Sequence, residues 1–165
     1  MPPAPLVRAD PATVADRIVV STDPDATRSL AEALARVAAP GDFLALIGDL
    51  GAGKTQFAKG FGAGLGVRAT INSPSFVLMA EYAGRLPLFH LDLYRLADAT
   101  DAFAGGLIDE RQAAGVTLIE WAERLGPALP IRRLEVRIDG TGDEPRTITL
   151  RAFDPSHRRY LEAIG

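Results

Sequence analysis

The amino-acid sequence predicts an α/β fold in which a mixed central sheet is flanked by helices. The first observation is a short apolar run, Phe43 to Ile47, typical of a strand buried on both faces. A glycine-rich loop follows it, then apolar residues at helical spacing, and Gly66 ends that helix. The second observation is two pairs of strand-like segments, each pair joined by a short turn, which makes each pair antiparallel. The sheet is therefore expected to contain strands of both directions.

The loop after the apolar run is a complete G-x4-G-K-T motif at residues 48–55. Gly48, Gly51 and Gly53 allow a positive φ, so that several N–H groups can turn into one concavity. The helix that follows directs its positive dipole end at the same point. A glycine-rich turn with an unrelated Lys-Thr pair is the alternative, but the motif has the required strand and helix on either side. The stretch predicts a P-loop, and hence a single P-loop NTPase-like domain.

We expect this loop to bind the phosphates of a nucleotide. Lys54 would reach the β- and γ-phosphates from a position that faces solvent, and the Thr55 hydroxyl would ligate Mg²⁺. No N-K-x-D string is present to read guanine, which disfavours a GTPase. The predicted binding residues of the loop are Gly48, Asp49, Leu50, Gly51, Ala52, Gly53, Lys54 and Thr55.

Local signals predict the other elements. Asp23-Pro24 begins a first helix, and glycines at 60, 62 and 64 in the P-loop helix indicate either close packing or mobility. Further strands are expected at 17–21, 76–83, 86–96, 115–121, 134–138 and 147–150, with hairpins formed by 76–83 with 86–96 and by 134–138 with 147–150. Further helices are expected at 98–114, where the pattern is weak, around 122–125, and after Asp154-Pro155.

Length and composition suit one globular domain, with 165 residues, 47% of them hydrophobic and 24% charged. The net charge of −3 gives no overall basic field for nucleic acid, so a connection to RNA would be local or pass through a partner. The absence of cysteine excludes thiolate metal sites, and His90 and His157 are too isolated to suggest a metal set. We expect a loose extension at 1–16 without a signal-peptide core, one domain at 17–165, no membrane span and a cytoplasmic location.

Two carboxylates follow predicted buried strands, Asp92 and Glu120. Strand carboxyl ends line the ligand crevice of an open α/β sheet, so both are expected to face the phosphates, although strand-end acids are also commonly solvated. Hydrolysis would need Mg²⁺ held from a second strand and an oriented water, which such acids can provide. Ser73 and Ser75 lie on a loop that either closes over the γ-phosphate or is a plain turn. Trp121, the single tryptophan, either lines the nucleotide pocket or packs in the core.

With these segments identified, the chain resembles the TsaE family (older name YjeE), the bacterial ATPases of tRNA threonylcarbamoyladenosine synthesis. The resemblance rests on four strings in the family's order and approximate spacing, and it spans about half of the chain. They are GDLGAGKT at 48–55, SPSF at 73–76, HLDLYRL at 90–96 and LIEWAE at 118–123. The family more often has SPT where this chain has Ser73-Pro74-Ser75, which preserves the hydroxyl.

The resemblance implies ATP and Mg²⁺ as ligands. Lys54 and Thr55 would hold the phosphates and the metal, Glu120 would be the second protein ligand of Mg²⁺, and Asp92 would orient a metal-bound or attacking water. The implied catalytic set is thus Lys54, Asp92 and Glu120, and the implied metal set is Thr55, Glu120 and Asp92. Ser73 and Ser75 would belong to a switch-like loop, with Trp121 beside the nucleotide.

The resemblance also implies a partner, the TsaB–TsaD heterodimer, so that tRNA is contacted only indirectly. Two alternatives remain open at this stage. One is a P-loop kinase of small molecules, which would transfer the phosphoryl group to an added acceptor. The other is a nucleotide-binding regulatory module whose hydrolysis is vestigial. P-loop hydrolysis commonly needs an added positive group; Arg95 could supply it in cis, whereas the resemblance favours activation by the partner.

Overall fold

The computed structural model describes residues 15–74, 78–96 and 110–164. The strands are β1 (Ala15–Ser21), β2 (Phe43–Ile47), β3 (Met79–Tyr82), β4 (Leu88–Asp92), β5 (Val116–Glu120), β6 (Leu134–Asp139) and β7 (Arg146–Ala152). The α-helices are α2 (Pro24–Ala35), α3 (Lys54–Gly64) and α5 (Arg159–Glu162), and the 3₁₀ segments are η1 (Glu110–Ala114), η2 (Ala122–Ala128) and η3 (Pro155–Arg158).

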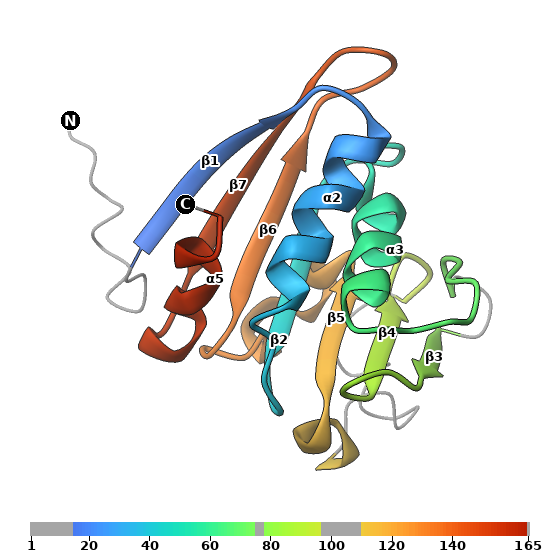
Figure 1. The fold of residues 1–165 in the computed structure, drawn as a ribbon, viewed down its shortest axis with the longest axis vertical. Helices are drawn as coiled ribbons and strands as arrows, with labels where there is room; N and C mark the ends of the chain where they lie inside the picture. Colours follow the sequence, from blue (N-terminus) through green and yellow to red (C-terminus); the bar gives the residue numbers. More distant parts are fainter. Residues whose placement is uncertain (1–14, 75–77, 97–109, 165) are drawn as a thin grey trace.

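All of these strands join one mixed sheet, as the sequence predicted (Figure 1). The strand order is β1-β7-β6-β2-β5-β4-β3. The four inner strands β6, β2, β5 and β4 run parallel, whereas β3, β7 and β1 pair antiparallel with their neighbours. Both predicted hairpins are present as β3–β4 and β6–β7. The P-loop leaves the central strand β2, so its neighbours β5 and β6 frame the loop.

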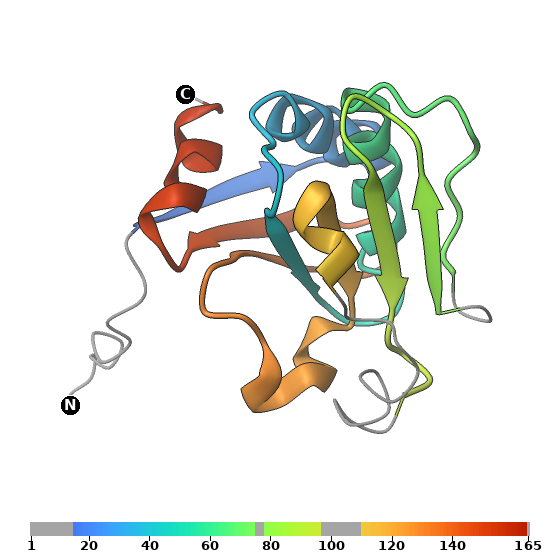
Figure 2. The ribbon, with the colours of Figure 1, turned by 90° about the horizontal axis from the view of Figure 1, so that it is seen from below.

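Helices cover the sheet unequally. α2 and α3 lie side by side on one face, while η2 lies on the opposite face (Figure 2). The face under α2 and α3 buries a large core that includes Leu34, Phe57, Phe61 and Leu118. The other face buries a smaller cluster around Phe43, Phe89, Leu91, Ile119 and Leu125. The β2–β5–β4 region is therefore buried on both sides, which explains the continuous apolar runs of these strands.

The glycines of α3 serve close packing. A Cβ at Gly60 would lie 2.2 Å from the carbonyl oxygen of Arg28, and one at Gly64 would lie 2.6 Å from that of Glu32. Both oxygens belong to the backbone of α2, so the two helices touch where α3 has no side chain. At Gly62 the neighbour is the Ile71 side chain, 2.0 Å from the hypothetical Cβ. Of the two predicted explanations, the structure supports close packing.

Some element boundaries in the structure differ from the predicted ones. β1 begins at Ala15, so residues 15 and 16 belong to the sheet and not to the predicted extension, whose other residues lie outside the described part. Of the predicted helix at 98–114, residues 110–114 form the short segment η1 and the rest lies outside the described residues. Within the described ranges, no helix has the length and apolar character needed to cross a membrane.

A buried polar network fastens the C-terminal segment to the start of β2. His157 is almost fully buried; its Nε2 accepts a hydrogen bond from the Phe43 N–H (3.2 Å), and its Nδ1 lies 2.6 Å from Asp154 Oδ1. Asp42 accepts hydrogen bonds from Tyr160 (2.5 Å) and from Arg159. Burial lowers the pKa of His157, against the opposing charges of Asp154 and Asp42. This histidine is a structural residue.

Candidate nucleotide-binding site

The P-loop joins β2 to α3 through residues 48–53, and its three motif glycines have different reasons to be glycine. Gly51 and Gly53 have φ of +81° and +114°, the left-handed region that favours glycine. Gly48 is not among the residues with positive φ, which corrects the prediction for that position. A Cβ there would lie 2.5 Å from the carbonyl oxygen of Ile138 on β6. Gly48 is therefore required by the close approach of the neighbouring strand.

Lys54 is buried, with 5% of its surface exposed, so the prediction that it faces solvent was wrong. Its ammonium donates hydrogen bonds to the carbonyl oxygens of Gly48 and Asp49, the latter at 3.0 Å. The same nitrogen lies 4.1 Å from the centroid of the Trp121 ring. Burial lowers the pKa of Lys54, and the nearby carboxylates, chiefly Glu120, oppose that shift.

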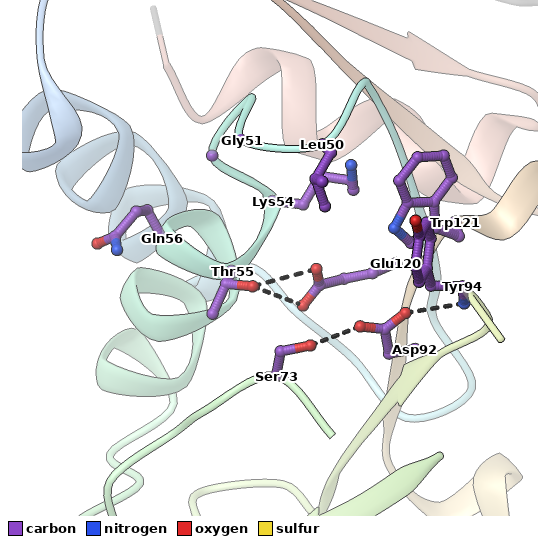
Figure 3. A pocket seen from close by; sticks show the side chains of 11 residues that line it. Leu50, Gly51, Lys54, Thr55, Gln56, Ser73, Asp92, Tyr94, Glu120 and Trp121 are labelled. Atoms are coloured by element: carbon purple, nitrogen blue, oxygen red, sulfur yellow. Dashed lines mark hydrogen bonds between the residues drawn. The ribbon is translucent and has the colours of Figure 1, made fainter. Parts of the chain in front are cut away.

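The two strand-end acids meet on neighbouring strands. Asp92 ends β4 and Glu120 ends β5, and the parallel register sets them directly opposite each other. Both are only 3% exposed, so neither is a solvated strand-end acid. The Thr55 hydroxyl lies 3.2 Å from each carboxylate oxygen of Glu120. Asp92 accepts hydrogen bonds from the Ser73 hydroxyl (2.5 Å) and from the N–H of Tyr94 (2.9 Å), as Figure 3 shows.

These groups surround a cavity of about 380 Å³ at the start of α3 (Figure 3). Its lining residues are Leu50, Gly51, Gly53, Lys54, Thr55, Gln56, Ser73, Asp92, Tyr94, Glu120 and Trp121. Most of the predicted site is therefore brought together. Gly48, Asp49 and Ala52 shape the loop without lining the cavity, and Ser75 lies outside the described residues. Gln56 and Tyr94 were missed, although Gln56 directly follows Thr55 and Tyr94 is two positions past Asp92.

Trp121 combines the two roles that the sequence left open. Its φ of +60° turns the chain sharply after β5, a conformation that is unusual for a bulky residue. The ring then lies over Lys54 and packs against Tyr94, with ring centroids 5.0 Å apart. It also packs against the smaller core cluster on the η2 side. Trp121 thus lines the cavity while being anchored in the core.

Arg146, on β7, was missed by sequence reasoning and supports the P-loop from outside. Its guanidinium donates hydrogen bonds to the carbonyl oxygens of Ala52 (3.0 Å) and Gly51 (3.3 Å), and also to that of Gly142 in the β6–β7 turn (3.0 Å). These contacts fix the orientation of two peptide groups of the P-loop, and a loop with a fixed backbone can direct other N–H groups at an anion. Arg146 also borders a second cavity, of about 250 Å³, between the P-loop and the β1–α2 and β6–β7 turns.

The central strand of a mixed sheet leads through a glycine loop into a helix, and two acids lie at the ends of two neighbouring strands. This arrangement defines a P-loop NTPase-like α/β protein. The crystal structure of YdiB from Bacillus subtilis has the same fold: it superimposes with a TM-score of 0.75 at 37% sequence identity, covering 90% of this chain and 93% of YdiB.

Sequence comparison gives the family. The model of the threonylcarbamoyl adenosine biosynthesis protein TsaE matches residues 21–148. The tRNA threonylcarbamoyladenosine biosynthesis protein TsaE of Bacillus subtilis is 44% identical over 146 residues, or 88% of this chain and 91% of that protein. The protein of the same name from Treponema pallidum is 42% identical over 115 residues, or 70% of this chain and 85% of that protein. The chain belongs to the TsaE family.

Proposed function

We propose that this protein binds ATP with Mg²⁺ in the larger cavity, hydrolyses it, and thereby supports threonylcarbamoyladenosine modification of tRNA. The observation that carries the proposal is the convergence of four chemical groups from three separate elements. Lys54 and Thr55 begin α3, Asp92 ends β4 and Glu120 ends β5, and all four line one cavity. Membership of a family named for this modification supplies the pathway.

The triphosphate of ATP is the substrate group that this cavity suits. The N-terminus of α3 presents unpaired N–H groups and the positive end of a helix dipole, which favour an anion. The Lys54 ammonium already lies inside the cavity, hydrogen-bonded to loop carbonyls. Phosphate oxygens would replace these carbonyls as acceptors and would form charge-assisted hydrogen bonds, which are the stronger kind. Binding would therefore draw Lys54 from the loop carbonyls towards the substrate.

The residues present also suit Mg²⁺. Thr55 and Glu120 bring a hydroxyl and a carboxylate within 3.2 Å of each other at the cavity wall, and hard oxygen donors are the ligands that Mg²⁺ prefers. In the described part of the chain no group of three or more His, Cys, Asp or Glu side chains could hold a metal by itself. Mg²⁺ is usually held by one or two protein groups together with substrate phosphates. When bound, Mg²⁺ would neutralise charge on the phosphates.

Asp92 is the residue we assign to the attacking water. Its carboxylate is held by Ser73 and by the Tyr94 N–H, so it lies in a defined orientation beside Glu120 and at the cavity wall. A carboxylate fixed in this way can accept a hydrogen bond from a water molecule and so direct the lone pair of that water at the terminal phosphorus. In P-loop hydrolysis this kind of positioning, with charge stabilisation, supplies most of the catalysis. Ser73, which donates to Asp92, belongs to the stretch that the resemblance to the TsaE family predicts to be switch-like.

We propose that the ribose and base of the nucleotide occupy the second cavity. It shares Gly51, Gly53 and Gln56 with the first cavity but lies towards the β6–β7 turn, away from Glu120. A nucleotide whose phosphates lie at Thr55 and Glu120 could extend past Gln56 into this space.

The partner we propose is the TsaB–TsaD heterodimer. The net charge of −3 provides no general attraction for tRNA, whose phosphates are normally gripped by a basic surface. Action through a protein complex that itself contacts tRNA is consistent with this charge. We propose the cytoplasm as the compartment.

Calorimetric titration with ATP and Mg²⁺ tests the binding proposal. The chain offers a matched pair, because its two lysines, Lys54 and Lys59, both lie on α3, and only Lys54 lines the cavity. Lys54→Ala should lose tight ATP binding while remaining folded, whereas Lys59→Ala should bind like the wild type. Tripolyphosphate should show the same pattern if the phosphate chain is the group recognised. Equal ATP affinity in the two variants would exclude Lys54 as a phosphate ligand.

A further inference from the structure

His90 is a polar residue in the middle of the buried strand β4, and its side chain is completely buried. The register of β4 and β5 pairs His90 with Leu118 and Asp92 with Glu120. Since side chains two residues apart on a strand share a face, His90 projects to the same side of the sheet as Asp92 and Leu88. A residue that only packed against this face would be apolar, as Leu88 is, because a buried polar ring costs free energy unless it is hydrogen-bonded.

The polar contact of this ring is made with Glu120. His90 Nε2 lies 2.7 Å from Glu120 Oε2. An ionised carboxylate only accepts hydrogen bonds, so the ring donates from Nε2–H. The other ring nitrogen, Nδ1, is buried and has no hydrogen-bond partner among the residues that the structure describes. An unpartnered buried nitrogen is unfavourable, and the contact with Glu120 offers a reason for a histidine at this position.

Glu120 is consequently held from two sides. Thr55 Oγ1, on the first turn of α3, lies 3.2 Å from both carboxylate oxygens, while His90 reaches Oε2 from the neighbouring strand. Without the histidine, the carboxylate could rotate about its side-chain torsions while keeping its contact with Thr55. Residues that hydrogen-bond a metal-binding carboxylate fix its orientation and affect metal affinity.

We propose that His90 is a positioning residue, whose Nε2–H holds the Glu120 carboxylate in the orientation needed to bind Mg²⁺. The inference rests on the proposed function, in which Glu120 is a metal ligand. His90 acts through Glu120 and touches neither the substrate nor the metal. It therefore contributes to metal affinity and has little effect on nucleotide binding without metal.

Variants at this position separate positioning from packing. His90→Leu removes the donor, whereas His90→Gln retains an N–H at a comparable reach. Phe89→Leu is the matched control, because Phe89 lies on the same strand but packs on the opposite face. Mg²⁺ affinity is measured calorimetrically at saturating concentration of an ATP analogue that is not hydrolysed, and affinity for the analogue is measured again in EDTA. Thermal melting of each variant reports folding.

His90→Leu should weaken Mg²⁺ binding by about 10–100-fold, the usual effect of removing such a partner. Its affinity for the analogue in EDTA should stay within about twofold, and His90→Gln and Phe89→Leu should bind Mg²⁺ nearly like the wild type. Unchanged Mg²⁺ affinity in folded His90→Leu, with Glu120→Gln impaired, overturns the role of His90 alone. Unchanged Mg²⁺ affinity in Glu120→Gln as well contradicts the proposed function itself.

A second readout needs neither metal nor a folded leucine variant. Nitrogen-15 NMR of the histidine rings in the metal-free protein reports which ring nitrogen carries a proton. The His90 ring should show a protonated Nε2, and its signal should shift in Glu120→Gln. An unprotonated Nε2, or a signal that ignores Glu120→Gln, overturns the proposal.

Discussion

The ammonium nitrogen of Lys54 lies 4.1 Å from the centroid of the Trp121 ring, within the range of a cation–π interaction. The two residues come from different elements, the start of α3 and the turn after β5, and the unusual backbone of Trp121 brings them together. Trp121 is the single tryptophan of the chain. Its fluorescence therefore reports directly on the position of the P-loop lysine.

Adding ATP with Mg²⁺ should change the Trp121 emission, because Lys54 would leave the ring to meet the phosphates. An emission titration measures this, and the change should saturate with the affinity found by calorimetry. Lys54→Ala should abolish the change, whereas Lys59→Ala should preserve it. A spectrum that does not respond to saturating ATP in the wild type would show that Lys54 keeps its place beside the ring.

The two acids should fail differently when made neutral. Glu120→Gln should leave ATP bound but weaken Mg²⁺ and slow hydrolysis, because an amide lacks the charge that a hard cation prefers. Asp92→Asn should reduce turnover more than metal affinity, because its assigned role is on the water. Phosphate release and Mg²⁺ titration are measured on both variants in the presence of TsaB and TsaD. Normal hydrolysis by both would show that this assignment is wrong.

Gly60→Ala should destabilise the fold although alanine is the better helix former. The added methyl group would enter the α2 backbone at Arg28, which cannot yield as a side chain could. Intrinsic helix propensity would favour alanine by up to about 1 kcal/mol. Overpacking should outweigh it and lower the free energy of unfolding by a net ~1–3 kcal/mol. Denaturant unfolding measures this loss, with Lys59→Ala on the same helix as the control. If Gly60→Ala were as stable as the wild type or more stable, the two helices would not be in contact here.

Mild acid should destabilise the protein through His157. Burial keeps its folded pKa below the ordinary histidine value of about 6.5. As pH falls through that value the unfolded chain binds a proton before the folded one does, so stability falls from neutral pH downwards. Protonation would also place an N–H against the Phe43 N–H, which now donates to Nε2.

Melting temperature between about pH 7.5 and pH 5.5 measures this effect, with each ~1 kcal/mol lost lowering it by roughly 2–4 °C at this chain length. His157→Gln should show a smaller decrease over that range, since glutamine does not titrate. The other histidine, His90, is present in both proteins, so the comparison isolates His157. An equal decrease in both proteins would assign the pH dependence to other groups.

The parts of the site that the sequence could predict are those whose geometry is local. The P-loop carries its own glycines, its strand and its helix, so Lys54 and Thr55 could be chosen from a short string. Asp92 and Glu120 could be chosen as strand-end acids, because carboxyl ends of strands gather at one edge of a sheet. The mixed sheet followed in the same way from turns of only a few residues.

The remaining features depend on distances between elements that a sequence does not state. Burial of Lys54 requires the Trp121 ring to fold over it, and nothing in the sequence predicted a left-handed backbone at that residue. The contact of His90 with Glu120 depends on the register of β4 with β5. Arg146 reaches the P-loop because β7 lies beside β6, which is itself a neighbour of β2. This contact can be inferred only once the strand order is known.

Steady-state phosphate release, with and without the TsaB–TsaD heterodimer, tests the central claim most directly. Apart from Lys54, the charged residues of the cavity wall are acids, and Arg95 is exposed and does not line the cavity. P-loop hydrolysis commonly needs an added positive group, which should therefore come with the partner. We predict slow release by the isolated protein and acceleration by the heterodimer, with Arg95→Ala accelerated like the wild type. Vigorous release by the isolated protein, unaffected by the heterodimer and lost in Arg95→Ala, would contradict this account.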